Sequence, residues 1–393
     1  MKIVFIADGR SAIARNWISH FTRPEHEIHL VSTSACAPLP GLTSLHILPV
    51  AFSGAGIQVK DGQVSKSGGL GLLRRLAPIW LRTFIRQRLG PLTLPRTAKR
   101  LSAILNEIQP DLVHAMRYPY EGILAALSDP AAPLLVSVWG NDFTLHAAAN
   151  PAIDRYTRRA LARTDALHTD CQRDLTLAYQ YGYPADRPVV VLPGSGGVKR
   201  EIFFPPKTAR PPAPPVIINP RGFRTYIRND VFFKAIPLVL AHYPQARFIC
   251  PAMADEAQAQ AWLTQYQITG SVELMPLIPH KDMGEVFRQA HIVVSPSTHD
   301  GTPNTLLEAI ACNCFPVAGD IDSIREWIID GENGLLVDPA NPSALADAIV
   351  QAIEDTTLRQ QAAEINQELI AARAEFQTVM ARAETFYQGV LHG

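Results

Sequence analysis

The sequence has few cysteines, no net charge and no long apolar run. Its five cysteines are scattered and odd in number, which argues against a disulfide framework and fits a reducing cytoplasm. No apolar run reaches the ~18 residues of a membrane span, and the start MKIVFIADG is too short for a signal peptide. The formal net charge is zero, so the total charge gives no pull toward nucleic acid. We therefore expect a cytoplasmic globular protein with no nucleic-acid partner.

One long stretch lacks acidic residues altogether. Between residues 62 and 106 there are nine basic residues and no Asp or Glu. A helix is expected to begin at Pro78, with aromatic and basic side chains close together on it. Such a helix is typical of an element that lies on anionic lipid, so 72–90 is predicted to contact a membrane surface. The alternatives are a helix with its aromatic residues in the core, and a basic groove for a phosphate-bearing acceptor. The side chains concerned are Trp80, Arg82, Phe84 and Arg86.

Short apolar runs alternate with helical patterns along the whole chain. This alternation predicts an α/β protein with parallel sheets, and 393 residues are enough for two domains. The segment from Pro193 to Pro215 is rich in Pro and Gly, which indicates a linker. The expected strands are 2–7, 27–31, 45–50, 111–115, 134–138, 166–169, 189–192, 216–219, 247–250, 272–275, 291–295, 315–317 and 335–337.

The most informative stretch follows the expected strand His291–Ser295. Thr302 is predicted as the N-cap of the next helix and Pro303 as its first residue. The unpaired N–H groups of such a helix start form an anion site, and Gly301 removes a side chain where a phosphate would approach.

Two carboxylates flank this helix start. Asp300 lies before it, and Glu308 lies one turn inside on the same face as Asn304 and Thr305. A carboxylate would repel phosphates, but it can accept hydrogen bonds from a vicinal diol such as ribose. Donors for a diphosphate, one carboxylate for a ribose and another for a second polyol describe a nucleotide-sugar site.

Asp300 and Glu308, with seven residues between them, resemble the paired-acid motif of the retaining GT-B glycosyltransferases of the family 4 type (glycosyl transferases group 1). Asp stands in the first acidic place, where Glu is more usual. The similarity continues through Ala309–Ile349, with Asn313 where Gly is usual. The resemblance implies a GT-B fold, in which two Rossmann-like domains with parallel sheets face each other across the active site. It implies an acceptor-side domain at 1–195, a linker at 196–215, a donor-binding domain at 216–374, and a C-terminal helix at about 375–393 that packs back on the first domain.

The resemblance also implies roles on the donor side. Arg221 matches an Arg that holds the diphosphate, and Asp300 and Glu308 would bind the sugar hydroxyls and the ribose. The Lys expected five residues after Arg221 is replaced by Tyr226, so Arg224 or Arg228 would substitute, although a surface salt bridge is the simpler role for Arg228. The predicted donor-binding residues are Arg221, Arg224, Arg228, Asp300, Gly301, Thr302, Pro303, Asn304, Thr305, Leu306 and Glu308.

The N-terminal half is less close to the family pattern. Gly9 and Arg10 follow the first strand, where Gly9 either admits a phosphate or acceptor or serves a tight turn. A G-x-G-x-x-G motif is absent, which argues against dinucleotide binding. His114 is predicted to be a hydrogen-bonded core histidine.

A second loop, 139–142, resembles the family's His-Gly-x-Asp segment that faces the donor sugar. Trp139 takes the place of the His, and Asp142 matches the Asp. The predicted catalytic residues are Asp300, Arg221 and Asp142. The predicted acceptor or phosphate loop consists of Gly9, Arg10, Asn141 and Asp142.

The resemblance implies a transferase that moves a hexosyl group, with retention, from a nucleotide-diphosphate sugar to an acceptor hydroxyl. The acceptor would be a saccharide or a lipid-linked saccharide in cell-surface polysaccharide, glycolipid or related synthesis, with the protein peripheral at the inner membrane face. No metal and no cofactor are expected, because Arg221 and the helix start would stabilise the leaving diphosphate. The alternatives are a nucleotide-sugar epimerase on the same fold and an inactive nucleotide-sugar-binding scaffold. Four departures from the family pattern favour the scaffold: Ile13 and Trp139 each replace a His, Lys199 replaces an Asp, and the Lys after Arg221 is missing.

Overall fold

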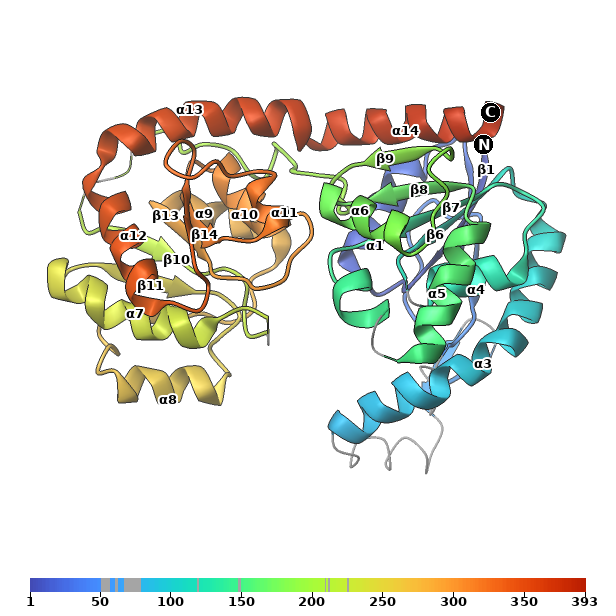
Figure 1. Cartoon of the computed structure of the whole chain (residues 1–393), viewed down its shortest axis with the longest axis horizontal. Coiled ribbons are helices and arrows are strands. Elements are labelled where there is room, and N and C mark those ends of the chain that lie inside the picture. Colours follow the sequence, from blue (N-terminus) through green and yellow to red (C-terminus); the bar gives the residue numbers. More distant parts are fainter. Residues whose placement is uncertain are drawn as a thin grey trace. The chain divides into compact units, whose positions relative to one another are not determined.

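The protein consists of two compact units. The computed structural model describes residues 1–50, 57–60, 63–66, 79–118, 120–147, 150–208, 210, 213–224 and 226–393, and for 57–60, 63–66 and 79–92 it describes the backbone alone. Unit 1 comprises Met1–Gly196 and Met380–Gly393, and unit 2 comprises Gly197–Val379. Each unit contains one parallel sheet covered by helices on both faces (Figure 1).

Unit 1 contains a seven-stranded parallel sheet in the order β3-β2-β1-β6-β7-β8-β9. The inner strands are buried and mostly apolar, as expected of a sheet covered on both faces, whereas the edge strands β3 and β9 are half-buried. A separate antiparallel hairpin is formed by β4 (Ile57–Lys60) and β5 (Gln63–Lys66). The sheet strands are β1 (Lys2–Ala7), β2 (Glu27–Ser32), β3 (Ser44–Ile47), β6 (Leu112–Met116), β7 (Leu134–Val138), β8 (Ala166–Thr169) and β9 (Val189–Val191).

Alternate residues of each unit 1 strand point to opposite helical layers. Val4 and Ile6 share a core with α3, α4, α5 and α6, whereas Phe5 contacts Phe21 of α1, which stacks on Tyr387 of α14. Consecutive packing of α3 on α4 and of α4 on α5 makes these three helices neighbours on one face (Figure 1). The helices are α1 (Ala12–Phe21), α3 (Ile79–Ile108), α4 (Glu121–Ser128), a π-helical turn η1 (Asp142–His146), α5 (Pro151–Arg163), α6 (Gln172–Gln180) and α14 (Phe376–His392).

The helix expected after Pro78 is present as the start of α3. The side chains predicted to contact a membrane, Trp80, Arg82, Phe84 and Arg86, lie outside the described residues, as does the segment 67–78. Within the described part of the chain, no helix is long and apolar enough to cross a membrane.

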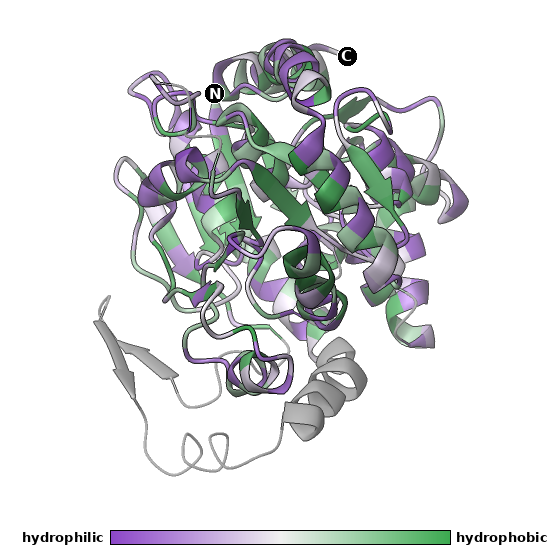
Figure 2. Cartoon of the chain, turned by 90° about the vertical axis from the view of Figure 1, so that its left-hand side faces the viewer, coloured by the Kyte–Doolittle hydropathy of each residue, from purple (hydrophilic) through white to green (hydrophobic). Residues whose placement is uncertain are grey.

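Unit 2 contains a six-stranded parallel sheet in the order β12-β11-β10-β13-β14-β15. Its strands are short and apolar, and they appear green in Figure 2 among helices that carry purple, hydrophilic residues. The strands are β10 (Val216–Ile218), β11 (Arg247–Cys250), β12 (Val272–Leu274), β13 (Ile292–Ser295), β14 (Phe315–Gly319) and β15 (Leu335–Val337).

The two faces of this sheet have separate cores. Ile217 packs with α7, α8 and α12, whereas its neighbour Ile218 packs with α9, α10 and α13. The helices are α7 (Asn229–His242), α8 (Ala257–Gln265), a 3₁₀ turn η3 (His280–Asp282), α9 (Met283–Gln289), α10 (Asn304–Ala311), α11 (Asp322–Arg325), α12 (Pro342–Glu354) and α13 (Thr356–Arg373).

A buried chain of hydrogen bonds joins α14 to the unit 1 sheet. The Trp17 indole donates to the Tyr387 hydroxyl at 2.9 Å, and that hydroxyl lies 2.5 Å from His114 Nδ1. His114 Nε2 lies 2.7 Å from Ser137 Oγ, which lies 2.8 Å from His168 Nδ1. The chain ends at the Leu192 carbonyl, 2.9 Å from His168 Nε2. His114 is thus the hydrogen-bonded core histidine that was predicted, and burial lowers the pKa of both histidines.

Candidate functional site

In each sheet, successive strands are added first toward one edge and then toward the other, which gives the sheet one topological switch point. In unit 2 this switch point lies between β10 and β13, and in unit 1 between β1 and β6. Loops that leave the carboxyl ends of such neighbouring strands diverge, which leaves room for a ligand. In unit 2 the two loops are joined by hydrogen bonds from the Arg228 N–H to the Pro296 carbonyl and from the Thr298 N–H to the Tyr226 carbonyl.

Arg221 and Asp300 meet at the unit 2 switch point. The guanidinium Nη1 of Arg221 donates to Asp300 Oδ2, and both side chains are largely buried. Burial alone would lower the pKa of Arg221, but the charge and the hydrogen bond of Asp300 raise it above its ordinary value. Asp300 is held further by the Gly301 N–H, 3.1 Å from its Oδ1, and by the Ser323 hydroxyl, 2.8 Å from its carbonyl. The structure therefore brings together the two residues predicted for the diphosphate and the sugar.

The predicted start of α10 is wrong by one residue. The helix begins at Asn304 with Pro303 as its N-cap, and no side chain caps it. Pro303 has ψ 67°, outside the helical region, because a tight turn precedes the helix: the Asn304 N–H donates to the Thr302 carbonyl at 2.9 Å. Thr302 is buried in this turn and is not the cap.

Glu308 lies one turn into α10 and is held by a residue from another loop. Its Oε1 is 2.7 Å from His280 Nε2, in the η3 turn after β12. The Glu308 side chain is only 12% exposed, whereas His280 is 62% exposed and its ring meets Phe203 edge-on at 5.1 Å. The hydrogen bond to Glu308 raises the pKa of His280. One Glu308 oxygen is thus anchored, while its other oxygen has no hydrogen-bond partner among the described residues.

The other predicted cations of this loop have different surroundings. Arg228 forms a two-point ion pair with Asp230, at 2.8 Å for both contacts, which is the surface salt bridge considered for it. Arg224 is exposed and donates to the Tyr226 hydroxyl at 2.9 Å. Arg224, unlike Arg228, has no carboxylate partner among the described residues.

The remaining residues predicted to bind the donor differ in how deeply they are buried. Asn304 and Thr305 are half-buried, whereas Gly301, Thr302 and Pro303 are buried. The Leu306 side chain lies in the core, so only its backbone can face a ligand. Asn313, where the family usually has Gly, has φ 59°, a left-handed conformation that Asn tolerates better than most residues.

At the unit 1 switch point, Gly9 and Arg10 are occupied by internal contacts. The Gly9 N–H donates to Ser32 Oγ at 3.0 Å, and a Cβ at this position would lie 2.4 Å from Cys36 Sγ. A larger residue would have to displace the Cys36 and Ser32 side chains, so packing favours Gly here independently of any ligand. Arg10 is exposed and holds Asp8 with two hydrogen bonds, at 3.0 and 2.7 Å.

Asp142 is fully buried and serves as an internal acceptor. Its Oδ1 accepts from Nε and Nη2 of Arg117, at 3.2 and 2.8 Å. Its Oδ2 accepts from the backbone N–H groups of Tyr118 and Trp139, at 2.9 and 3.1 Å. Burial raises the pKa of Asp142 to about 6 against the opposing charge of Arg117. Asp142 thus fixes Arg117 and the turn at 139–142, and its own oxygens face inward.

Two other atoms of this loop have no hydrogen-bond partner in the described part of the chain. They are Asn141 Oδ1 and Trp139 Nε1, both buried. Buried polar atoms are normally paired, so water or a ligand is expected beside them. Trp139 also packs against Gly194, where a Cβ would lie 2.9 Å from its Nε1.

Among the described residues, one group has the spacing of metal ligands. The ligating atoms of Asp170, Cys171 and Asp174 lie within 4.8 Å of one another. Cys171 is the N-cap of α6 and Asp174 lies in its first turn, which explains their closeness. Arg173 already donates to Asp174 Oδ1, and burial raises the pKa of the Cys171 thiol far above its ordinary value. A thiol that stays protonated is a poor ligand.

Arg117 and His280 were not among the predicted site residues. Arg117 contacts Asp142, which lies 25 positions away in the chain, and His280 contacts Glu308, which lies 28 positions away. No spacing rule links such residues. The sequence offers one indication for each: Arg117 directly follows the apolar run of a strand, and His280 lies in the loop after another strand.

Two family models match the chain, one for each unit. Residues 9–194 match the glycosyl transferase 4-like domain, and residues 201–369 match glycosyl transferases group 1. A D-inositol 3-phosphate glycosyltransferase of Xylanimonas cellulosilytica is 27% identical over 219 residues, which cover 50% of each chain. The chain thus spans about half the length of that relative.

Solved structures share the fold over nearly the whole chain. A sucrose-phosphate synthase from Thermosynechococcus elongatus has a TM-score of 0.73 at 15% identity, with 99% of both chains covered. HepE from Anabaena, in complex with UDP and glucose, has a TM-score of 0.69 at 16% identity, with 99% of this chain and 100% of that chain covered. Two parallel Rossmann-like sheets, the two family matches and these neighbours agree, and the chain belongs to the group 1 glycosyltransferases of the GT-B fold.

Proposed function

We propose that this protein transfers a hexosyl group from a nucleoside-diphosphate sugar to an acceptor hydroxyl, with retention of configuration. The observation that carries the proposal is the contact of Arg221 with Asp300 at the switch point of unit 2, with Glu308 in the helix that follows Asp300. A cation, two carboxylates and a helix start are the groups that a diphosphate, a sugar and a ribose require. The HepE structures are complexes with UDP and glucose and with UDP-glucose, which supports a donor of this class.

In the proposed reaction, negative charge develops on the leaving diphosphate. Arg221 would stabilise that charge, with Arg224 as the second cation, because its guanidinium has no carboxylate partner among the described residues. Asp300 would exchange its contact with Arg221 for the sugar hydroxyls, and Glu308 would accept the ribose hydroxyls. We propose that these residues suffice without a metal. Turnover unchanged by a chelator is expected, and turnover restored only by an added divalent ion would contradict this part.

Two other functions make different predictions for the same protein. A nucleotide-sugar epimerase would convert the donor without an acceptor, and an inactive scaffold would bind at most the nucleotide. The test is a titration of nucleoside diphosphates and their sugars, followed by product analysis with and without acceptor. Transfer that depends on an acceptor is expected. A changed sugar in the absence of acceptor would favour the epimerase.

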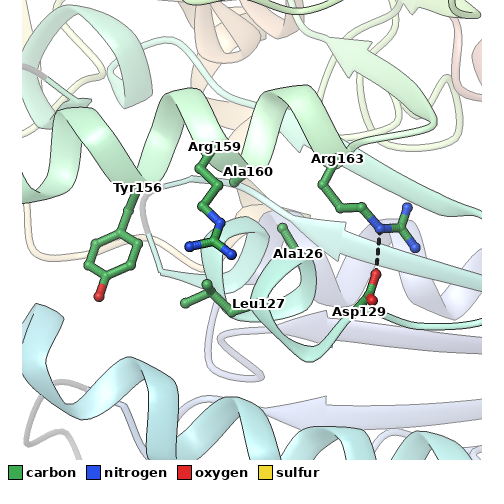
Figure 3. Close-up of a pocket in the computed structure, with 7 residues that line it drawn as sticks. All are labelled: Ala126, Leu127, Asp129, Tyr156, Arg159, Ala160 and Arg163. Atoms are coloured by element: carbon green, nitrogen blue, oxygen red, sulfur yellow. Dashed lines mark hydrogen bonds and ion pairs between the residues drawn. The ribbon is translucent and has the colours of Figure 1, made fainter.

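We also propose that unit 1 associates with an anionic surface at the inner face of the membrane, where a lipid-linked acceptor would lie. The supporting residues are exposed cations on the outer side of α3 and α5, without an acidic partner in the described part of the chain. Figure 3 shows a pocket between α4 and α5 into which Arg159 points, beside Tyr156 and Leu127. Arg163 in the same pocket is already paired with Asp129 at 2.8 Å. The unpaired cations are Arg96, Lys99, Arg100, Arg155 and Arg159.

Flotation with lipid vesicles tests this association. Binding to vesicles with anionic lipid, lost at high salt and absent with neutral lipid, is expected. Arg155→Glu with Arg159→Glu should weaken it, whereas Arg382→Glu with Lys234→Glu, exposed cations elsewhere, should not. Arg82→Glu with Arg86→Glu tests the first half of α3 in the same way. Binding that ignores salt and all these reversals would contradict the proposal.

A further inference from the structure

The backbone of Arg117 adopts a conformation that is rare for its residue type. Its φ is 97°, in the region that favours glycine, and it directly follows β6 at the unit 1 switch point. Its carbonyl accepts the Gly122 N–H at 3.0 Å, which fixes the turn into α4. Strained backbone of this kind concentrates at binding sites, where the surrounding structure holds a side chain in a required place.

The guanidinium of Arg117 is fixed on one edge and open on the other. Nε and Nη2 donate to Asp142, Nε also donates to the Tyr118 carbonyl at 3.1 Å, and the group lies 5.9 Å from the centre of the Trp139 ring. Nη1 has no acceptor among the described residues, and the side chain is 35% exposed. Both carboxylate oxygens of Asp142 accept the hydrogen bonds that hold this arrangement. The result is a preorganised cation with one free donor edge.

The acidic groups around Arg117 leave that edge available to an anion. Asp8 is held by Arg10 at two points. Glu121 is 5% exposed and accepts from the Thr33 hydroxyl at 2.6 Å, and burial raises the pKa of this carboxyl. Asp142 is buried behind the guanidinium. None of the three carboxylates is both exposed and without a partner in the described structure.

We propose that Arg117 recognises an anionic group, a phosphate or a carboxylate, on the acceptor substrate. The proposal rests on the function proposed above and adds the chemical class of the acceptor. A planar guanidinium matches either anion through two parallel hydrogen bonds, which a hydroxyl cannot provide. Asp142 is then a positioning residue that acts through Arg117.

The test is a titration with inorganic phosphate at constant ionic strength. The nucleoside diphosphate that binds best is present at saturation, so that the diphosphate site of unit 2 is filled. Arg117→Gln should raise the phosphate Kd at least about tenfold, and Arg117→Lys should raise it less, because it keeps the charge but loses the fork. Arg382→Gln, an exposed arginine of unit 1 on α14, is the matched control and should change nothing.

A second readout separates recognition from folding. Arg117→Gln leaves a buried carboxylate unpaired, so the double variant with Asp142→Asn, which removes both charges, is measured beside it. In turnover, the ratio of kcat/KM for glucose 6-phosphate or glucuronate to that for glucose should fall about tenfold in either variant. The same two anions distinguish phosphate from carboxylate.

Equal phosphate Kd in the wild type and the double variant would overturn the proposal, as would a wild type that binds nucleotide but not phosphate. If no nucleoside diphosphate binds, the proposed transferase function fails instead. The phosphate titration is then read without nucleotide, and the difference between the wild type and the Arg117 variants still decides the role of Arg117.

Discussion

The contact between His280 and Glu308 predicts a measurable titration. Because Glu308 accepts its hydrogen bond, His280 has a raised pKa, and its protonated form is favoured in the folded state. The stabilisation is complete below the ordinary histidine value of about 6.5 and is lost as the pH rises through the higher folded value. An NMR titration of the His280 ring should give a pKa above 6.5. Glu308→Gln should return it toward that value, and an unshifted wild-type ring would contradict the contact.

Glu308 itself is predicted to bind the donor. Glu308→Gln keeps the size of the side chain but removes the charge that strengthens hydrogen bonds from ribose, so nucleotide affinity should fall by roughly 1–3 kcal/mol. Calorimetric titration measures this, with Glu332→Gln, an exposed acid of unit 2, as the control. Equal affinities of wild type and Glu308→Gln would remove Glu308 from the ribose.

Arg221 is predicted to matter more for turnover than for stability. The ion pair with Asp300 is lost in Arg221→Ala, but Asp300 keeps its contact with the Gly301 N–H. Charge on the diphosphate develops chiefly in the transition state, so kcat should fall more than donor affinity. Steady-state kinetics at saturating donor, together with urea unfolding, separate the two effects. Wild-type turnover would place the diphosphate elsewhere, and Arg224 would be tested next.

At the scale of elements, the strands were predictable and the start of α10 was not. Strands such as β8 (Ala166–Thr169) are confirmed because a buried parallel strand is a continuous apolar run with clear ends. The start of α10 depends on the tight turn at Thr302 and Pro303, which the residue types at these positions did not indicate. Asp142 was predicted but its partner Arg117 was not, because that contact joins residues 25 positions apart.

The hydrogen-bonded chain between α14 and the sheet is the element-scale feature with a sharp consequence for stability. Tyr387→Phe removes a hydroxyl that joins Trp17 to His114, and it leaves the Trp17 indole N–H and His114 Nδ1 without that partner. The free energy of unfolding should fall by about 1–3 kcal/mol. Urea unfolding measures it, with Tyr179→Phe as the control, since Tyr179 is 39% exposed. A loss no larger than that of the control would mean that the chain adds nothing to stability.

At the scale of the whole molecule, unit 2 is an insertion in unit 1. The chain leaves unit 1 after Gly196 and returns to it at Met380, within α14. The Pro- and Gly-rich composition of Pro193–Pro215 indicated where the chain crosses from unit 1 to unit 2. The composition does not indicate where the chain returns to unit 1, because that point lies inside a regular helix.

This discontinuity determines the order in which the protein can be completed during synthesis. The sheet of unit 1 is finished once β9 has left the ribosome, but the partner that Trp17 and His114 require, Tyr387, emerges only after all of unit 2. For the whole time that Gly197–Val379 is being translated, the face of the sheet beneath α14 therefore stays open to water or to a chaperone. A segment that is made after unit 2 thus completes the packing of a sheet that is made before it.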